Sequence, residues 1–345
     1  MRYVRPLVVL IAALAAVLPV PARAIERVYS QGVYPLLQPA VTSVSSLTSI
    51  ALFDVSVAAL LAFVGALFVH RWRARGFARA AGRTLVTIGT LAAVVYLWFL
   101  LLWGLNYRRV PLEERLAYDA ARVTRERAGF LAREAVRRAN ALAADDAAAH
   151  LDEEALARSL RDVQHALGSG ARLRVAPPKR SLLGWYFRQA AIDGMTNPFF
   201  LEIVLNPDLL PFERPFVLAH EWAHLAGFAD ESEANFIAWL TCIRADAAAR
   251  YSGWTTAYQH LSSQLPREER QALRAELSPA VLADLVAASR RVARASPAVR
   301  MVARDAYDTY LRANRVEEGI ASYNAVVRLM VGTAFDAEWQ PELRR

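Results

Sequence analysis

Long apolar runs dominate the first third of the chain. Residues 50–69 contain one charged residue, Asp54, and residues 84–105 contain none. A helix rises about 1.5 Å per residue, so each run is long enough to cross the roughly 30 Å hydrocarbon layer of a bilayer. A third, shorter run covers residues 7–20. The pattern predicts transmembrane spans at about 4–22, 50–69 and 84–105.

The first apolar run has two interpretations. It follows Arg2 and Arg5 and precedes Ala22-Arg23-Ala24, which is the arrangement of a cleavable secretory signal. If the helix begins near Tyr3, the same run is long enough for a retained first span. The residue pattern alone favours neither interpretation.

The segment between the two long runs predicts their orientation. Residues 70–83 carry five arginines and no acidic residue, and short loops of this kind stay in the cytoplasm. The span at 84–105 then leads out of the cytoplasm, so residues 106–345 are expected to lie outside. Residues 25–49 would form a short external connection.

The charge distribution argues against a nucleic-acid-binding protein. The formal net charge is +8, but residues 1–105 hold nine arginines against two acidic residues. Residues 106–345 are almost neutral, with 32 basic and 31 acidic residues. The positive excess lies beside the apolar runs, which leaves no basic face for nucleic acid. The single cysteine, Cys242, also excludes an intramolecular disulfide and a thiolate zinc cluster.

The remainder of the chain has the pattern of a mainly α-helical domain. Apolar residues recur at helical spacing over three stretches: 111–142, 151–167 and most of the chain after 212. Two short segments, 172–176 and 199–205, have the alternation or apolar clustering of strands. We therefore predict a membrane anchor at 1–105, followed at 106–345 by a mostly helical domain with a small β-sheet.

One motif in this domain indicates metal chemistry. Residues 220–224 read His-Glu-Trp-Ala-His. Residues four apart share one face of a helix, so His220 and His224 can bind the same Zn²⁺. Glu221 lies beside them, where its carboxylate can take a proton from a water on the metal. The alternative is a pair of buried histidines satisfied by backbone groups, but two core histidines flanking a glutamate are uncommon.

A catalytic zinc needs a third protein ligand, and the segment after the motif offers three carboxylates. They are Asp230, Glu231 and Glu233. We rank Glu231 first because Asn235 lies four residues later on the same helical face, where its amide can orient a ligand histidine. Glu233 is the alternative ligand, and Asp230 ranks third.

These residues carry a resemblance to known families. His220-Glu221-x-x-His224 followed by Glu231-x-x-Ala234-Asn235 resembles the gluzincin arrangement, in which a second helix supplies a glutamate with Asp or Asn four residues later. The chain also resembles a bacterial membrane family catalogued as domain of unknown function 3810. The resemblance rests on five segments: 103–107, 220–242, 251–253, 308–311 and 319–323. It implies a zincin-like domain behind three membrane spans, which favours retention of the first apolar run.

The expected function is that of a membrane-anchored zinc metallopeptidase with one Zn²⁺ per chain. His220, His224 and Glu231 would bind the metal, Asn235 would support the site, and Glu221 would be the catalytic base. The expected partners are the lipid bilayer and a peptide or protein substrate outside the cytoplasm. The expected location is the bacterial inner membrane, with the catalytic domain on the periplasmic or extracellular side. The alternative is a membrane-tethered binding or scaffold protein with a structural metal.

Overall fold

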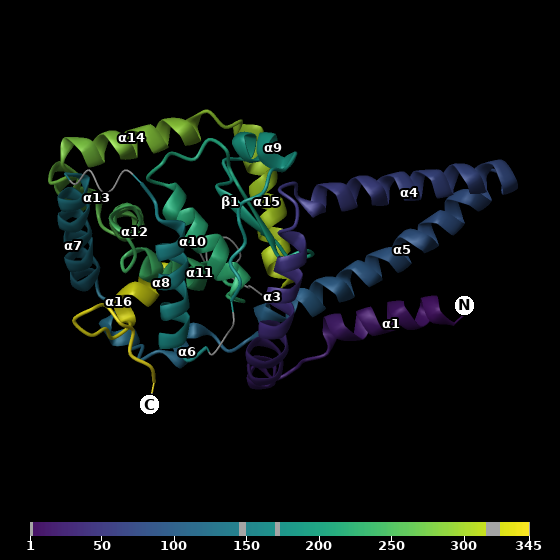
Figure 1. Cartoon of the computed structure of the whole chain (residues 1–345), viewed down its shortest axis with the longest axis horizontal. Helices are drawn as coiled ribbons and strands as arrows, with labels where there is room; N and C mark the ends of the chain where they lie inside the picture. Colours follow the sequence, from purple (N-terminus) through teal and green to yellow (C-terminus); the bar gives the residue numbers. More distant parts are fainter. Residues whose placement is uncertain (1–2, 145–149, 170–172, 315–324, 345) are drawn as a thin grey trace.

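A computed structural model describes residues 3–144, 150–169, 173–314 and 325–344. The described chain is mainly helical and contains one two-stranded sheet (Figure 1). Residues 319–323, which carry part of the family resemblance, lie outside the described residues. The predicted strand at 172–176 begins outside them, and residues 173–176 form no strand.

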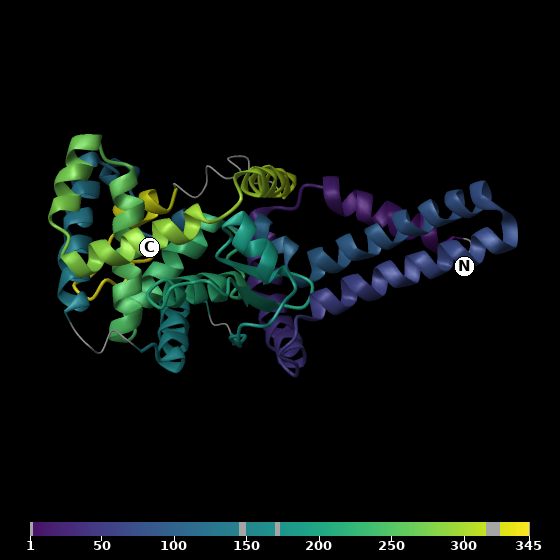
Figure 2. The same ribbon diagram turned by 90° about the horizontal axis from the view of Figure 1, so that it is seen from above.

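Two long apolar helices project together from the helical domain (Figures 1 and 2). α4 (Leu52–Arg75) and α5 (Phe77–Leu102) are both long and apolar enough to cross a membrane. Only Gly76 separates them, with a positive φ of 76° that favours glycine. The predicted Arg-rich loop at 70–83 is therefore helical except at Gly76. Arg and Ala are good helix formers, so both helices continue beyond their apolar runs into the Arg-rich segment.

The N-terminal segment forms a bent pair of helices. α1 (Val4–Val17) packs along α5 and ends before two prolines, so it is shorter than the predicted span at 4–22. A turn of 112° separates it from the next helical stretch. That stretch consists of α2 (Ala22–Ala24), η1 (Ile25–Val33) and α3 (Tyr34–Ser45). The N-terminal end and the α4–α5 turn both lie at the end far from the domain (Figure 1).

The predicted short connection at 25–49 is mostly helical and packs against the helical domain. Tyr34, Gln38 and Thr42 are buried, and Tyr29 and Tyr34 belong to the main hydrophobic core. The Tyr34 hydroxyl donates to the Leu225 carbonyl oxygen at 2.8 Å, and the Thr42 hydroxyl donates to the Leu201 carbonyl oxygen at 3.0 Å. The apolar side chains of this segment pack into the core of the domain, and its polar side chains bond backbone groups of the domain.

The domain itself is a cluster of helices around a central buried pair. The pair is α10 (Arg214–Leu225) and α11 (Glu231–Cys242), which pack on each other. Three short helices follow α5 along the chain: η2 (Gly104–Arg108), α6 (Leu112–Arg115) and η3 (Ala120–Arg122). The longer helices are α7 (Arg125–Ala143), α8 (Glu153–Ala166), α9 (Leu183–Ala190), α12 (Ala247–Ser263), α13 (Arg267–Ala275), α14 (Pro279–Ala293), α15 (Pro297–Ala313) and α16 (Ala325–Gly332).

The predicted helix at 111–142 is interrupted between α6 and α7. Leu116 and Tyr118 instead form bridges with Leu343 and Thr333 near the end of the chain. Thr124 then caps α7 by accepting a hydrogen bond from the Arg127 N–H. The pairing partner is more than 200 residues away, so no local pattern could indicate it.

The sheet consists of β1 (Gly194–Asn197) and β2 (Glu202–Leu205), which are antiparallel with Gly194 opposite Leu205. The predicted strand at 199–205 is thus shorter than expected, because its first residues form the turn between β1 and β2. On its other side, β2 bridges to Pro178. β2 is therefore the inner strand, and β1 is the edge strand that lies against α10.

Candidate metal centre

The motif residues lie on one buried turn of α10, and the chain reverses directly after it. α10 ends at Leu225, and Gly227 adopts a positive φ of 88° that ends the helix. Asp230 then caps α11, because its side chain accepts hydrogen bonds from the N–H groups of Ser232 and Glu233. This tight connection brings the first turn of α11 against the histidine face of α10.

Three side-chain atoms converge across this helix pair. His220 Nε2 lies 3.1 Å from His224 Nε2. Glu231 Oε2 lies 3.3 Å from His220 Nε2 and 3.6 Å from His224 Nε2. The side chains of His224 and Glu231 are 8% and 4% exposed. Among the described residues, these three form the group whose ligand atoms are close enough to share one metal ion.

The arrangement fits a zinc ion on two grounds. Tetrahedral zinc with ligands at about 2.0–2.2 Å places those ligands about 3.3–3.6 Å apart. The three separations, 3.1, 3.3 and 3.6 Å, lie close to this range. In addition, Glu231 Oε2 is buried without a hydrogen-bond partner in the described structure. A buried carboxylate oxygen aimed between two imidazole nitrogens is an arrangement that a cation stabilises.

The charges of these groups are strongly coupled. Burial lowers the pKa of His224, but the neighbouring Glu231 carboxylate raises it to about 9. Burial likewise raises the pKa of Glu231, yet the two histidines hold it well below its usual value. The carboxylate is thus stabilised as an anion by positive charge in this place, which is what a metal ligand requires.

His224 is oriented by the chain that follows the motif. Its Nδ1 lies 2.8 Å from the Phe228 carbonyl oxygen, which directs Nε2 toward His220 and Glu231. The indole N–H of Trp103 donates to the His224 carbonyl oxygen at 3.1 Å. Trp103 directly follows α5. A contact from the end of the apolar hairpin, formed by α4 and α5, therefore holds the turn that carries His224.

Glu221 lies on the side of α10 that faces β1. The Thr196 hydroxyl donates to Glu221 Oε2 at 2.8 Å. A Cβ atom at Gly194 would lie 2.5 Å from Glu221 Oε1, so only glycine leaves room for the carboxylate there. Glu221 is 3% exposed, and burial raises its pKa although the two histidines oppose the shift. A carboxylate with a raised pKa is suited to accept and return a proton.

The structure brings Glu231 to the histidines and places the other two acidic residues elsewhere. Glu233 points toward α6, where its Oε1 accepts the Leu112 N–H, and burial raises its pKa to about 7. Asp230 is the helix cap described above. Both residues therefore have structural partners of their own.

Among the described residues, no hydrogen bond joins Asn235 to either histidine. Asn235 is buried one turn after Glu231, but within the described chain its Nδ2 has no hydrogen-bond partner. The orienting bond to His224 comes instead from the Phe228 carbonyl, because the short connection after Gly227 brings this backbone group within reach.

Besides the Phe228 carbonyl, four residues that contact the site were not predicted from the sequence. The Tyr307 hydroxyl, on α15, donates to Glu231 Oε1. Thr196 and Gly194 hold Glu221, and Trp103 supports His224. Trp103 stood in one of the segments used for the resemblance. Tyr307 and β1 carried no signal, since a single tyrosine in an exposed helix and a four-residue strand have no distinctive pattern.

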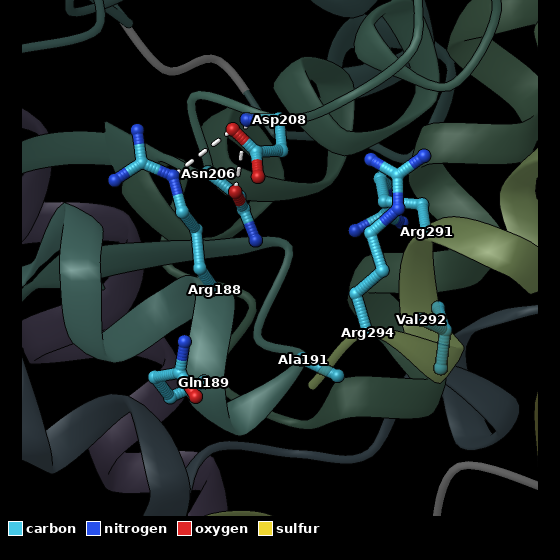
Figure 3. Close-up of a pocket in the computed structure, with 8 residues that line it drawn as sticks. All are labelled: Arg188, Gln189, Ala191, Asn206, Asp208, Arg291, Val292 and Arg294. Atoms are coloured by element: carbon cyan, nitrogen blue, oxygen red, sulfur yellow. Dashed lines mark hydrogen bonds and ion pairs between the residues drawn. The ribbon is translucent and has the colours of Figure 1, made fainter. Parts of the chain in front are cut away.

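A separate cavity of about 100 Å³ lies between α9 and α14 (Figure 3). Two of its arginines pair with acidic residues: Arg188 with Asp208 at 3.0 Å, and Arg291 with Glu213 at 2.8 Å. The cavity is lined by none of the histidine-cluster residues. It is thus distinct from the cluster of His220, His224 and Glu231.

The fold and the site together define a helical protein with an apolar hairpin and a buried His₂–carboxylate cluster. The chain belongs to the family described as "Protein of unknown function (DUF3810)", whose model matches residues 29–331. The match includes α4, α5 and the whole histidine cluster, so the apolar hairpin and the cluster are both within the family's extent. Neither the curated proteins nor the solved structures contain a match to this chain.

Proposed function

We propose that this protein is a zinc-dependent metallopeptidase anchored in a membrane. The observation that carries the proposal is the convergence of His220 Nε2, His224 Nε2 and Glu231 Oε2 beside the buried carboxylate of Glu221. A purely structural metal has no need of a carboxylic acid next to its ligands. Two histidines and one carboxylate also leave a fourth position free on a tetrahedral ion, as in catalytic zinc sites.

We assign each residue of the site a role from its position. When bound, zinc would supply Lewis-acid activation of the attacking water and of the scissile carbonyl. His220, His224 and Glu231 would hold the ion. Glu221 would accept a proton from the attacking water and return it to the leaving amine nitrogen. The Thr196 hydroxyl would keep the Glu221 carboxylate oriented during both transfers.

The edge strand β1 is suited to bind the substrate. Among the described residues it pairs with β2 on one side only, and Gly194 and Thr196 lie against Glu221. A peptide in extended conformation can add to such an edge through backbone hydrogen bonds, which gives affinity without a demanding side-chain sequence. We place the substrate backbone along β1, rather than along the inner strand β2.

We assign the domain to the gluzincin type of zincin fold. The support is the order of elements: an edge strand, a helix with the two histidines, a tight turn and a second helix with the glutamate. β1, α10 and α11 follow this order.

We also propose that α1, α4 and α5 cross a bacterial inner membrane and that the helical domain lies on the periplasmic side. The N-terminal end and the Arg-rich α4–α5 turn lie at the same end, far from the domain (Figure 1). Positively charged ends of this kind stay in the cytoplasm.

The proposal can be tested on the full-length protein purified in detergent. We expect about one zinc per chain. We also expect cleavage of a randomised peptide library, detected by mass spectrometry, to stop when a chelator removes the metal. Glu221→Gln should retain zinc and lose cleavage. Zinc binding without any cleavage by the wild type would support the alternative, a tethered scaffold with a structural metal.

A further inference from the structure

We propose that the substrate is a polypeptide anchored in the same membrane and cut within a few residues of the bilayer surface. This inference rests on the peptidase function proposed above and adds the class of substrate. It depends on where the metal centre lies relative to the ends of the apolar helices.

The candidate metal centre lies next to the C-terminal end of α5, where this helix meets the helical domain. The last residue of α5 is Leu102, and the next residue, Trp103, donates its indole N–H to the His224 carbonyl oxygen at 3.1 Å. The ring centroids of Trp103 and His224 are 6.1 Å apart. One of the proposed ligands is therefore separated from the end of the span by a single side-chain contact.

Comparison of α5 with the thickness of a bilayer gives the depth of the candidate metal centre relative to the membrane. The apolar part of α5, residues 84–102, is about 27 Å long and matches the hydrocarbon layer of roughly 30 Å. The headgroup layer adds about 5–7 Å on each side. Trp98, which is 45% exposed, lies at this end, as aromatic residues do at membrane interfaces. A histidine ring about 6 Å from Trp103 thus lies at the level of the headgroups.

The edge strand leads from the membrane to Glu221. Its turn carries Phe199, which stacks on Phe53 of α4 at 6.2 Å and contacts Phe99 of α5 at 6.2 Å. The Trp98 indole N–H donates to the Phe199 carbonyl oxygen at 3.1 Å. Thr196, which holds Glu221, is only three residues away along the chain. A peptide paired with β1 would therefore extend directly toward the bilayer.

The domain presents exposed apolar side chains on this same side. Trp185 on α9 is 65% exposed, and Leu182 just before it is 85% exposed. The Leu182 N–H donates to Asp54 in the first turns of α4, so this surface is continuous with the apolar hairpin. α9 and α15 both lie on the side from which the hairpin projects (Figure 1). Contact with lipid explains why these large apolar side chains are exposed.

These observations restrict the substrate. A bond that is held by its own anchor near the headgroups is presented to the site at high effective concentration. A free peptide has no such advantage, and a bond far above the surface must fold back to reach the site. Since an extended chain advances about 3.3–3.6 Å per residue, the scissile bond is expected within about five residues of the anchor.

The position of the site can be measured without any reaction. Nitroxide labels would be placed at Trp185→Cys and, as the matched control, at Arg267→Cys on the distant helix α13 of the full-length protein. In vesicles of phosphatidylethanolamine and phosphatidylglycerol, label 185 should collide with oxygen more often, and with a water-soluble nickel chelate several-fold less often, than label 267. Equal accessibility of the two labels to both reagents would overturn the inference.

The substrate class can be tested in the same vesicles. A randomised peptide library would carry a palmitoyl chain after a spacer of about 4 or about 20 residues, with unacylated peptides as the control. We expect cleavage at least about tenfold faster for the short-spacer acylated peptides. Equal cleavage of all three libraries would refute the inference and leave the peptidase proposal intact. No cleavage of any library above the Glu221→Gln background would refute the proposed function itself.

Discussion

Lys179 and Glu202 form a fully buried ion pair, with Lys179 Nζ 2.8 Å from Glu202 Oε2. The side chains are 1% and 0% exposed. The Glu202 carboxylate also accepts the N–H groups of Leu52 and Phe53, which begin α4. Negative charge at this helix N-terminus is stabilised by the helix dipole. The pair therefore joins the sheet beside the candidate metal centre to the start of an apolar helix.

Lys179→Met should destabilise the protein by about 3–5 kcal/mol, because it leaves the Glu202 carboxylate buried without its counter-charge. The matched control is Arg188→Met, which removes a half-exposed pair with Asp208 and should cost less than about 1 kcal/mol. Denaturant unfolding of the detergent-solubilised protein measures both. Equal losses would show that the buried pair has no special role.

The histidine motif predicts a clear separation of metal binding from hydrolysis. His220→Ala and His224→Ala should each abolish zinc binding, since two ligands remain at most. Glu221→Gln should keep about one zinc per chain and lose peptidase activity. Metal analysis and peptide cleavage on the same preparations give both results. Loss of zinc in Glu221→Gln would mean that Glu221 holds the metal rather than the proton.

The two buried glutamates of α11 provide a matched pair for identifying the third ligand. Glu231→Gln should severely weaken zinc binding, because the amide carries no charge to balance the ion. Glu233→Gln should leave zinc affinity nearly unchanged, since Glu233 bonds the Leu112 N–H instead. Titration against a competing chelator measures the affinities. The assignment would be reversed if Glu233→Gln were the variant that lost zinc.

Tyr307 is expected to position Glu231. Tyr307→Phe removes the hydroxyl that donates to Glu231 Oε1 and should lower zinc affinity about 10–100-fold, as losses behind a metal ligand do. Tyr310→Phe is the control: Tyr310 stacks on Tyr307, but its hydroxyl lies 3.4 Å from the Tyr107 hydroxyl. It should retain the wild-type affinity. An equal drop in both variants would indicate damage to α15 rather than loss of one bond.

The orientation in the membrane is open to a direct test. A reporter enzyme that is active only outside the cytoplasm should be active when it is fused after Arg345, because the Arg-rich turn is expected to stay inside. A reporter that is active only in the cytoplasm serves as the control. Activity of the second fusion alone would reverse the proposed topology.

Much of the architecture was predictable because its signals are local. The two long apolar runs predicted the helices that can cross a membrane, and helical periodicity predicted a mainly α domain. The spacing of His220 and His224 placed both on one helical face, and both lie on α10. Each of these features depends on residues within a few turns of one another.

The tertiary structure alone decided which distant groups meet at the site. Sequence ranking favoured Glu231 because of Asn235, yet Phe228 and Tyr307 make the supporting contacts. The sequence also predicted a strand at 199–205, but the strand that lies against Glu221 is β1, for which it gave no signal. The sequence by itself determined the apolar helices, the helical domain and the histidine motif, because short-range periodicity encodes them. Partners such as Tyr307, 76 residues from Glu231, become neighbours only through packing of the whole chain, which no local pattern records.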